Sequence, residues 1–304
     1  MTANARVDFA CDGFAILPAY LDDDDLSAAR EALPAVFPTA DEFHDDVDPA
    51  RNARFRDEFG GITNFPFDAV ELNLVAVHER LIDLAADLLG DDDLRVYSIE
   101  AWAKYTGAAA YDQPHHRDYL SQSLLVPEPG APARQVEMFL YLCDVPVELG
   151  PPRYVPMEHT AALPAIPNWY PRVDAPVDPE FPTWSATSGT PHLYDAEVAA
   201  AGPAGTVVAY RIDTFHRGSE LTRPRGARYT IHLNFRVAAH DWIARRGWTD
   251  KANTEPWHAF VARATPKQLQ TFGFPPPGHP YWTSDTLAGM AARYAGFDPE
   301  PWRA

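Results

Sequence analysis

A histidine and a carboxylate stand two residues apart at His116-x-Asp118. In an extended strand, residues two apart point to the same side, so these two side chains could reach one metal ion. A second histidine would complete the two-histidine, one-carboxylate set that binds non-haem iron(II) and leaves positions open for a chelating co-substrate and dioxygen. The value of this pair as a metal site therefore depends on a third ligand from elsewhere in the chain.

The same spacing occurs a second time, at His44-x-Asp46, so the motif is weak by itself. That second pair lies in the acidic stretch 41–48, which has no strand pattern, and we interpret it as solvated surface. A third ligand must come from a distant strand, and His216 lies at the end of one, within 211–219. The candidate metal site is therefore His116, Asp118 and His216.

An arginine follows the third candidate ligand at the start of a cleanly alternating segment, Arg228 to Val237. Polar side chains occupy one face of this predicted strand and apolar side chains the other. An oxygenase that uses 2-oxoglutarate needs a cation deep in its pocket, where a guanidinium can pair bidentately with the distal carboxylate. Arg228 is the candidate for that role; a solvated residue on a polar sheet face is the alternative. Lys104 and His232 lie on polar faces of predicted strands and could line the pocket.

The elements that would position these residues change character along the chain. Residues 1–94 are predicted to be mostly helical, with a short strand at 13–18 and helices over 26–33 and 69–89. From residue 95 the apolar period becomes two, and strands are predicted at 96–105, 137–143, 206–212 and 228–237. Residues 241–304 return to helix, with a capping box over 265–268, a proline-rich run and a final helix over 284–294.

Many short strands with helices outside them predict a mainly β fold, a jelly-roll or cupin-like barrel. We expect one domain, 1–304, with a mostly helical flank over 1–94, the jelly-roll core over 95–240, and a helical and proline-rich flank over 241–304. The core contains a long loop, 157–203, without a sustained period. Its aromatic residues could form a lid over the substrate, although packing of the loop itself is the more common use: Trp169, Tyr170 and Trp184.

Charge and cysteine content limit which partners and which cellular compartment are expected. The 304 residues carry 43 acidic and 25 basic side chains, a net charge of −18, which disfavours nucleic acid and anionic membrane surfaces as partners. The two cysteines, Cys11 and Cys143, form no disulfide framework, and the N-terminus has no signal-peptide pattern. We therefore expect a cytoplasmic protein that acts on a small molecule.

Three stretches together resemble the phytanoyl-CoA dioxygenase family, which includes ectoine hydroxylase: His115-His-Arg-Asp118, Gly150 to Pro156, and the segment from Phe215-His-Arg-Gly-Ser219 to Pro224-Arg-Gly-Ala-Arg-Tyr229. The resemblance implies a double-stranded β-helix. It assigns the iron to the three candidate ligands and the 2-oxoglutarate carboxylate to Arg228. The spacing from His216 to Arg228 is one residue longer than is usual in the family, so Arg225 is a rival. Phe139, with Tyr141 on the same face, matches the position of an aromatic residue near the co-substrate.

The resemblance implies an enzyme that uses iron(II), 2-oxoglutarate and dioxygen, with ascorbate as a supporting reductant. Its expected reaction is hydroxylation of an unactivated C–H bond, with release of succinate and carbon dioxide. A polyanionic CoA thioester is a poor candidate substrate for a chain of net charge −18. Two alternatives stay open: the same site could perform desaturation, cyclisation or another oxidation, or the barrel could be catalytically silent and only bind a metal or ligand.

Overall fold

The computed structural model describes residues 2–128, 130–177, 179, 184–245 and 247–303. Within these residues the strands form two antiparallel sheets, and no helix is long and apolar enough to cross a membrane. The major sheet has the order β1-β9-β5-β11-β3-β2. Its strands are β1 (Phe14–Leu17), β9 (Val207–Tyr210), β5 (Gln135–Tyr141), β11 (Ala227–Val237), β3 (Leu94–Tyr105) and β2 (Ile62–Asn64).

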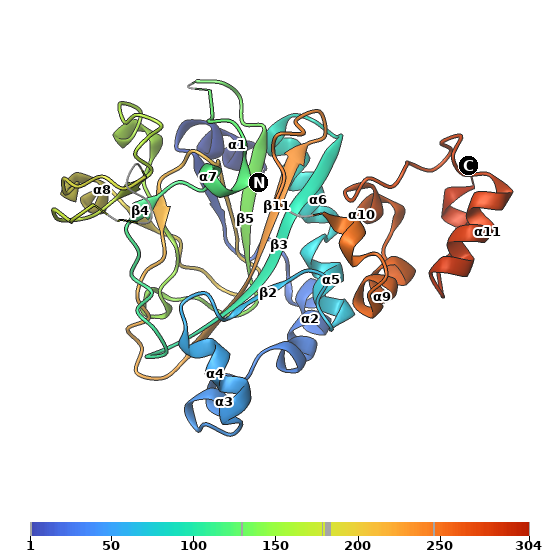
Figure 1. Cartoon of the computed structure of the whole chain (residues 1–304), viewed down its shortest axis with the longest axis horizontal. Coiled ribbons are helices and arrows are strands. Elements are labelled where there is room, and N and C mark those ends of the chain that lie inside the picture. Colours follow the sequence, from blue (N-terminus) through green and yellow to red (C-terminus); the bar gives the residue numbers. More distant parts are fainter. Residues whose placement is uncertain (1, 129, 178, 180–183, 246, 304) are drawn as a thin grey trace.

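The minor sheet faces the side of the major sheet away from most helices and is built from two-residue strands (Figure 1). Its order is β7-β4-β10-β6-β8. The strands are β7 (Trp169–Tyr170), β4 (His115–His116), β10 (His216–Arg217), β6 (Arg153–Tyr154) and β8 (Val198–Ala199). Because such short strands bury little surface, their placement depends on side-chain contacts with the loops around them.

Helices cover the other face of the major sheet. In Figure 1 α2 (Asp23–Val36), α5 (Val70–Ala76), α6 (Glu79–Leu89), α9 (Glu255–Arg263) and α10 (Pro266–Gln270) lie on this side. The apolar faces of β3 and β11 pack against them in one core. The opposite, polar faces line a cavity between the sheets. The alternation in the sequence therefore separates a core face from a pocket face, as predicted.

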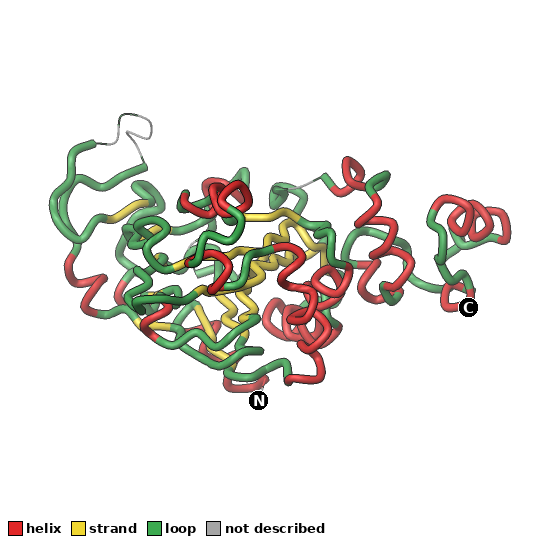
Figure 2. The backbone as a smooth tube through the Cα atoms, turned by 90° about the horizontal axis from the view of Figure 1, so that it is seen from below, coloured by secondary structure: helices red, strands yellow, loops and turns green. Residues whose placement is uncertain are grey.

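The remaining helices lie at the periphery. They are α1 (Thr2–Cys11), α3 (Ala40–His44), α4 (Pro49–Ala53), α7 (Tyr119–Gln122), α8 (Pro191–Asp195) and α11 (Ser284–Arg293), together with short 3₁₀ turns. Figure 2 shows α11 at the end of the molecule near the C-terminus. The predicted capping box begins α10: the Thr265 hydroxyl accepts from the Gln268 backbone, and the Gln268 side chain accepts from Thr265 N–H.

One predicted helix is wrong in its extent. The expected helix over 69–89 is two helices, α5 and α6, separated at Val77 and His78. The His78 imidazole accepts from the backbone N–H of Arg80, which caps α6, and its Nε2 lies 3.2 Å from Asp25. The apolar period continues through the break because both helices pack against the same core. Periodicity alone therefore could not reveal the break.

Candidate metal centre

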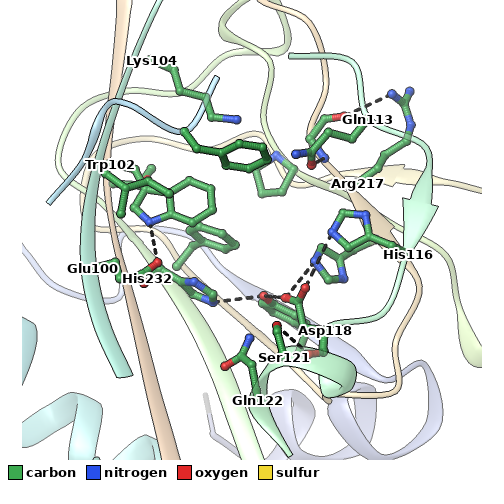
Figure 3. Close-up of a pocket in the computed structure, with 18 of the residues that line it drawn as sticks. Glu100, Trp102, Lys104, Gln113, His116, Asp118, Ser121, Gln122, Arg217 and His232 are labelled. Atoms are coloured by element: carbon green, nitrogen blue, oxygen red, sulfur yellow. Dashed lines mark hydrogen bonds and ion pairs between the residues drawn. The ribbon is translucent and has the colours of Figure 1, made fainter. Parts of the chain in front are cut away.

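The three candidate ligands meet at the junction of β4 and β10. His116 and His216 are direct partners in the register of these antiparallel strands, and their ring centroids are 4.6 Å apart. Asp118 lies beside them (Figure 3): its Oδ1 is 3.7 Å from His116 Nε2 and its Oδ2 is 3.3 Å from His216 Nε2. One ligand atom from each residue falls within 4.8 Å of the others. These residues are called the metal cluster below.

The structure corrects how the carboxylate reaches the cluster. We expected His116 and Asp118 on one extended strand, but β4 ends at His116. Asp118 has helical backbone angles (φ −91°, ψ −8°) and stands directly before α7. A turn, not strand alternation, therefore brings the carboxylate to the imidazoles.

Backbone carbonyls orient both imidazoles. His116 Nδ1 lies 3.0 Å from the Pro114 carbonyl oxygen, and His216 Nδ1 lies 3.2 Å from that of Thr214. If each Nδ1 carries the proton and donates it to the carbonyl, each Nε2 presents a lone pair to the centre of the cluster. Two imidazole nitrogens and one carboxylate oxygen are the donor set that suits iron(II).

The protonation states of His116 and Asp118 suit a bound cation. Burial, followed by the neighbouring His216, lowers the pKa of His116 to about 4, so this imidazole is neutral near pH 7. Burial alone would raise the pKa of Asp118, but His216 and then His116 outweigh it and hold that pKa well below its usual range. An ionised carboxylate and a neutral imidazole are the protonation states that a divalent metal requires.

A buried polar network supports Asp118. The Tyr210 hydroxyl lies 2.7 Å from Glu137 Oε2, 3.2 Å from Asp118 Oδ2 and 3.1 Å from His232 Nε2. Burial, followed by Glu137, raises the pKa of Tyr210 well above its ordinary value, so the hydroxyl keeps its proton and remains a donor. Neither Tyr210 nor Glu137 was singled out from the sequence. Both lie in predicted strands, and only the pairing of β5 with β9 brings them together.

Two buried cations lie on the polar strand faces, away from the acidic part of the cavity. Lys104 on β3 and Arg228 on β11 are partners in the register of these strands and are 3% and 5% exposed. Arg228 Nη1 has no hydrogen-bond partner among the residues that the structure describes. The ammonium of Lys104 lies 4.6 Å from the centre of the Tyr111 ring. Burial, followed by Arg228, lowers the pKa of Lys104 to about 7. A buried cation without a partner is costly, so this pair fits an anionic ligand.

The metal cluster and the cation pair open into the same cavity, which has a volume of about 210 Å³. Phe139 also lines this cavity, and its ring stacks on the His232 imidazole with a centroid distance of 4.4 Å. Figure 3 shows Lys104 at one side of this space, with His116 and Asp118 at another. Among the predicted site residues, the structure brings to the cavity His116, Asp118, His216, Arg228, Lys104, Phe139 and His232.

Two predicted co-substrate residues do not line the cavity. Arg225 is a surface residue whose guanidinium pairs with Asp41 and Asp45, at 3.0 and 2.9 Å. The Tyr141 side chain is fully buried and is not among the residues that line the cavity; its hydroxyl donates to the Ala200 carbonyl at 2.7 Å. Both were expected near the co-substrate because of their positions in the sequence. Of the two arginines, only Arg228 projects from the pocket face of a strand.

Among the residues that the structure describes, the second histidine–aspartate pair belongs to no group of three possible metal ligands. His44 ends α3, and its Nε2 lies 3.2 Å from both the carbonyl oxygen and the amide nitrogen of Gly226. Asp46 accepts from the Asn52 amide at 3.1 Å. The pair was interpreted as solvated surface, but His44 is half-buried.

The long loop contributes one aromatic residue to the cavity. Trp169 on β7 stacks on the His116 imidazole with a centroid distance of 4.3 Å and an interplanar angle of 11°. Tyr170 instead packs edge-on against Phe215, and the Trp184 carbonyl accepts the Trp169 N–H. Of the three residues considered for a lid, Trp169 is the one that lines the cavity.

Several solved structures have a similar fold. The chain resembles the α-ketoglutarate-dependent epimerase SnoN from nogalamycin biosynthesis (18% identity, 78% of this chain and 83% of that chain covered, TM-score 0.51). It also resembles EctD from S. alaskensis with 2-oxoglutarate and 5-hydroxyectoine (17% identity, 82% of this chain and 82% of that chain covered, TM-score 0.54). A third similar structure is AviO1 from Streptomyces viridochromogenes Tue57 (19% identity, 80% of this chain and 98% of that chain covered, TM-score 0.52). SnoN has also been solved with Fe³⁺ and α-ketoglutarate. At these identities the likeness concerns the fold.

The sequence itself identifies the family. None of the curated proteins matches the chain. The family model of phytanoyl-CoA dioxygenase matches residues 9–225, which is most of the chain and includes the whole metal cluster. This chain therefore belongs to the phytanoyl-CoA dioxygenase family and is an iron- and 2-oxoglutarate-dependent oxygenase.

Proposed function

We propose that the protein hydroxylates an unactivated C–H bond of a small molecule and releases succinate and carbon dioxide. The observation that carries this proposal is the position of Arg228: a buried guanidinium with an unpartnered Nη1, in the same cavity as the metal cluster. One group offers three ligands to a metal, and the other offers a fork to a carboxylate. A five-carbon 2-oxo diacid carries a chelating end and a distal carboxylate, which matches both features.

Each side chain has a separate task in this proposal. The metal cluster would hold iron(II), and Arg228, with Lys104 beside it, would bind the distal carboxylate of 2-oxoglutarate. When bound, iron and 2-oxoglutarate activate dioxygen for attack on a C–H bond. Tyr210 holds the Oδ2 side of Asp118, while Phe139 and other apolar side chains of the cavity exclude water from the reacting groups.

The remaining features of the proposal concern the whole chain. We propose that the two sheets are the walls of a double-stranded β-helix, that residues 1–304 form one domain, and that the protein acts in the cytoplasm. The antiparallel order of both sheets and the cavity between them support the first point. The substrate would be a small molecule that enters this cavity.

The same residues are compatible with other outcomes of hydrogen abstraction. SnoN is an epimerase and SnoK, at 21% identity and a TM-score of 0.50, a carbocyclase. Hydroxylation places an oxygen atom from dioxygen in the product, whereas epimerisation, desaturation and ring closure through carbon do not. The isotope content of the product therefore distinguishes these reactions.

The test is a substrate screen with succinate formation as the readout. Purified protein is given iron(II), ascorbate, 2-oxoglutarate and ¹⁸O₂ with a panel of small molecules, and a chelator provides the control. We expect substrate-dependent succinate and a product about 18 mass units heavier than the substrate, because one ¹⁸O atom is inserted into a C–H bond and the hydrogen is kept in the new hydroxyl group. An isomerised or dehydrogenated product without ¹⁸O would refute hydroxylation. Failure to form succinate with any substrate would support a catalytically silent barrel.

The low pKa of Lys104 predicts a pH dependence of co-substrate binding. Below pH 7 the ammonium is charged and attracts the 2-oxoglutarate carboxylate; above pH 7 the free protein loses this charge. Affinity for 2-oxoglutarate should therefore fall as pH rises through about 7, by at most about tenfold per pH unit. Anaerobic titrations of the iron(II) protein at pH 6 to 9 measure this dependence. Lys104→Met should remove it; an equally steep dependence in that variant would contradict the assignment to Lys104.

A further inference from the structure

A buried carboxylate lies behind the metal cluster, at the end of the long loop. Glu197 precedes β8, and its side chain is only 7% exposed. It accepts hydrogen bonds from Arg217 Nε at 2.7 Å, Arg217 Nη2 at 2.9 Å and Arg153 Nη1 at 3.1 Å. Its Oε2 is also 3.1 Å from His115 Nε2. Burial alone would raise the pKa of Glu197, but hydrogen bonds from Arg217 outweigh it and hold that pKa at about 2.

The partners of Glu197 are the chain neighbours of the metal-binding histidines. His115 precedes His116 on β4, and Arg217 follows His216 on β10. Successive residues of a strand point to opposite faces, so a group that holds His115 and Arg217 fixes the strands without entering the metal site. Figure 3 shows the Arg217 guanidinium directed away from the His116 imidazole. Arg153 adds the next strand, because it pairs with Arg217 in the β6–β10 register.

The strands themselves cannot fix this arrangement. Each has two residues, and β4 and β10 share only the His216–His116 pair in their ladder. The distance between the two imidazoles therefore depends on contacts outside the ladder. The long loop supplies a second such contact: Asn168 Oδ1 accepts from Arg117 Nε at 3.2 Å, and Arg117 follows β4, between the candidate ligands His116 and Asp118.

From these contacts we propose that Glu197 is a positioning residue for the metal cluster: it ties the strand of His116 to the strand of His216 from behind. The proposal rests on the proposed metal site. It gives the long loop a role beyond covering the substrate, because the loop delivers the carboxylate that sets the spacing of two ligands. Outer partners of metal ligands commonly change metal affinity by about 10- to 100-fold when they are lost.

Glu197→Gln tests this role while keeping the size of the side chain. The probe is Co(II) alone, titrated into the metal-free protein, with visible absorption reporting both the dissociation constant and the ligand geometry. We expect Co(II) to bind roughly tenfold or more weakly to the variant, with an altered absorption band. Glu197→Asp, which keeps the charge with a shorter reach, should recover part of the affinity. Glu158→Gln, an exposed glutamate of the same loop, is the matched control.

The outcomes separate this proposal from the metal site itself. A merely structural Glu197 would lower the melting temperature of the metal-free protein and leave the Co(II) affinity and spectrum of the folded variant unchanged; that result would overturn the proposal. If Glu197→Gln does not fold, the same comparison is made with Glu197→Asp, and wild-type affinity there together with a wild-type spectrum would overturn it. Equal Co(II) binding by wild type and Asp118→Ala would instead refute the metal cluster.

Discussion

Asp118→Ala is expected to abolish metal binding and, with it, succinate formation. Asp118 is the anionic ligand of the cluster, and its removal leaves two imidazoles to hold a divalent cation in a buried site. The loss should exceed the roughly 10- to 100-fold that follows removal of an outer partner of a ligand. Asp118→Asn, which keeps the shape but not the charge, should also bind metal more weakly. Anaerobic iron(II) titration and succinate release measure the two effects.

The second histidine–aspartate pair provides the control. Asp46 has the same spacing from a histidine, but its side chain accepts from Asn52 and pairs with Arg56 near the surface. Its φ of 52° is a conformation that asparagine tolerates, so Asp46→Asn should fold and retain wild-type iron affinity and turnover. Wild-type activity in Asp118→Ala, or equal losses in both asparagine variants, would show that the metal cluster is not the reactive site.

The parts of the site that could be predicted are those encoded by local period. Alternation along 228–237 places Arg228 and His232 on the pocket face of β11, and the same period along β3 places Lys104 there. Each of these assignments needs only the knowledge that strand side chains alternate. The register that sets Lys104 opposite Arg228 is a property of two strands far apart in the chain, and neither segment encodes it alone.

The parts that could not be predicted depend on contacts between distant segments. Asp118 reaches the cluster through a turn whose geometry leaves no periodic trace. Tyr210 acquires its position from the pairing of β9 with β5, and Glu197 from a loop whose residues follow no helix or strand period. A buried polar residue on a loop gives no local signal, since the sequence pattern is the same whether its partner is water or an arginine.

The two cations of the cavity stand out in a strongly acidic chain. The chain carries a net charge of −18, yet two of its cations lie buried on one cavity wall without a carboxylate at ion-pair distance among the described residues. Ample acidic side chains exist to neutralise them. That no described carboxylate pairs with these two cations is expected if a ligand supplies the negative charge, because a permanent internal ion pair would compete with it.

Replacement of Arg228 should therefore weaken 2-oxoglutarate binding far more than it changes metal binding. Loss of one partner of a buried, hydrogen-bonded charge pair costs about 2–4 kcal/mol, which corresponds to a roughly 30- to 700-fold rise in the dissociation constant. We expect a rise of this size for Arg228→Gln, with the Co(II) affinity of the metal cluster nearly unchanged. The dissociation constant of Arg228→Lys for 2-oxoglutarate should lie between those of Arg228→Gln and wild type, since an ammonium keeps the charge but not the bidentate fork.

Arg225→Gln is the matched control for this prediction, because it removes the rival arginine from a surface ion pair. Exposed pairs of this kind contribute little, and the variant should bind 2-oxoglutarate as the wild type does. The measurement is the spectral change when 2-oxoglutarate is titrated into the anaerobic iron(II) protein. A large loss in Arg225→Gln with wild-type binding in Arg228→Gln would transfer the role to Arg225. Equal, small effects in both would show that the distal carboxylate binds elsewhere in the cavity, whose wall also carries the buried cation of Lys104.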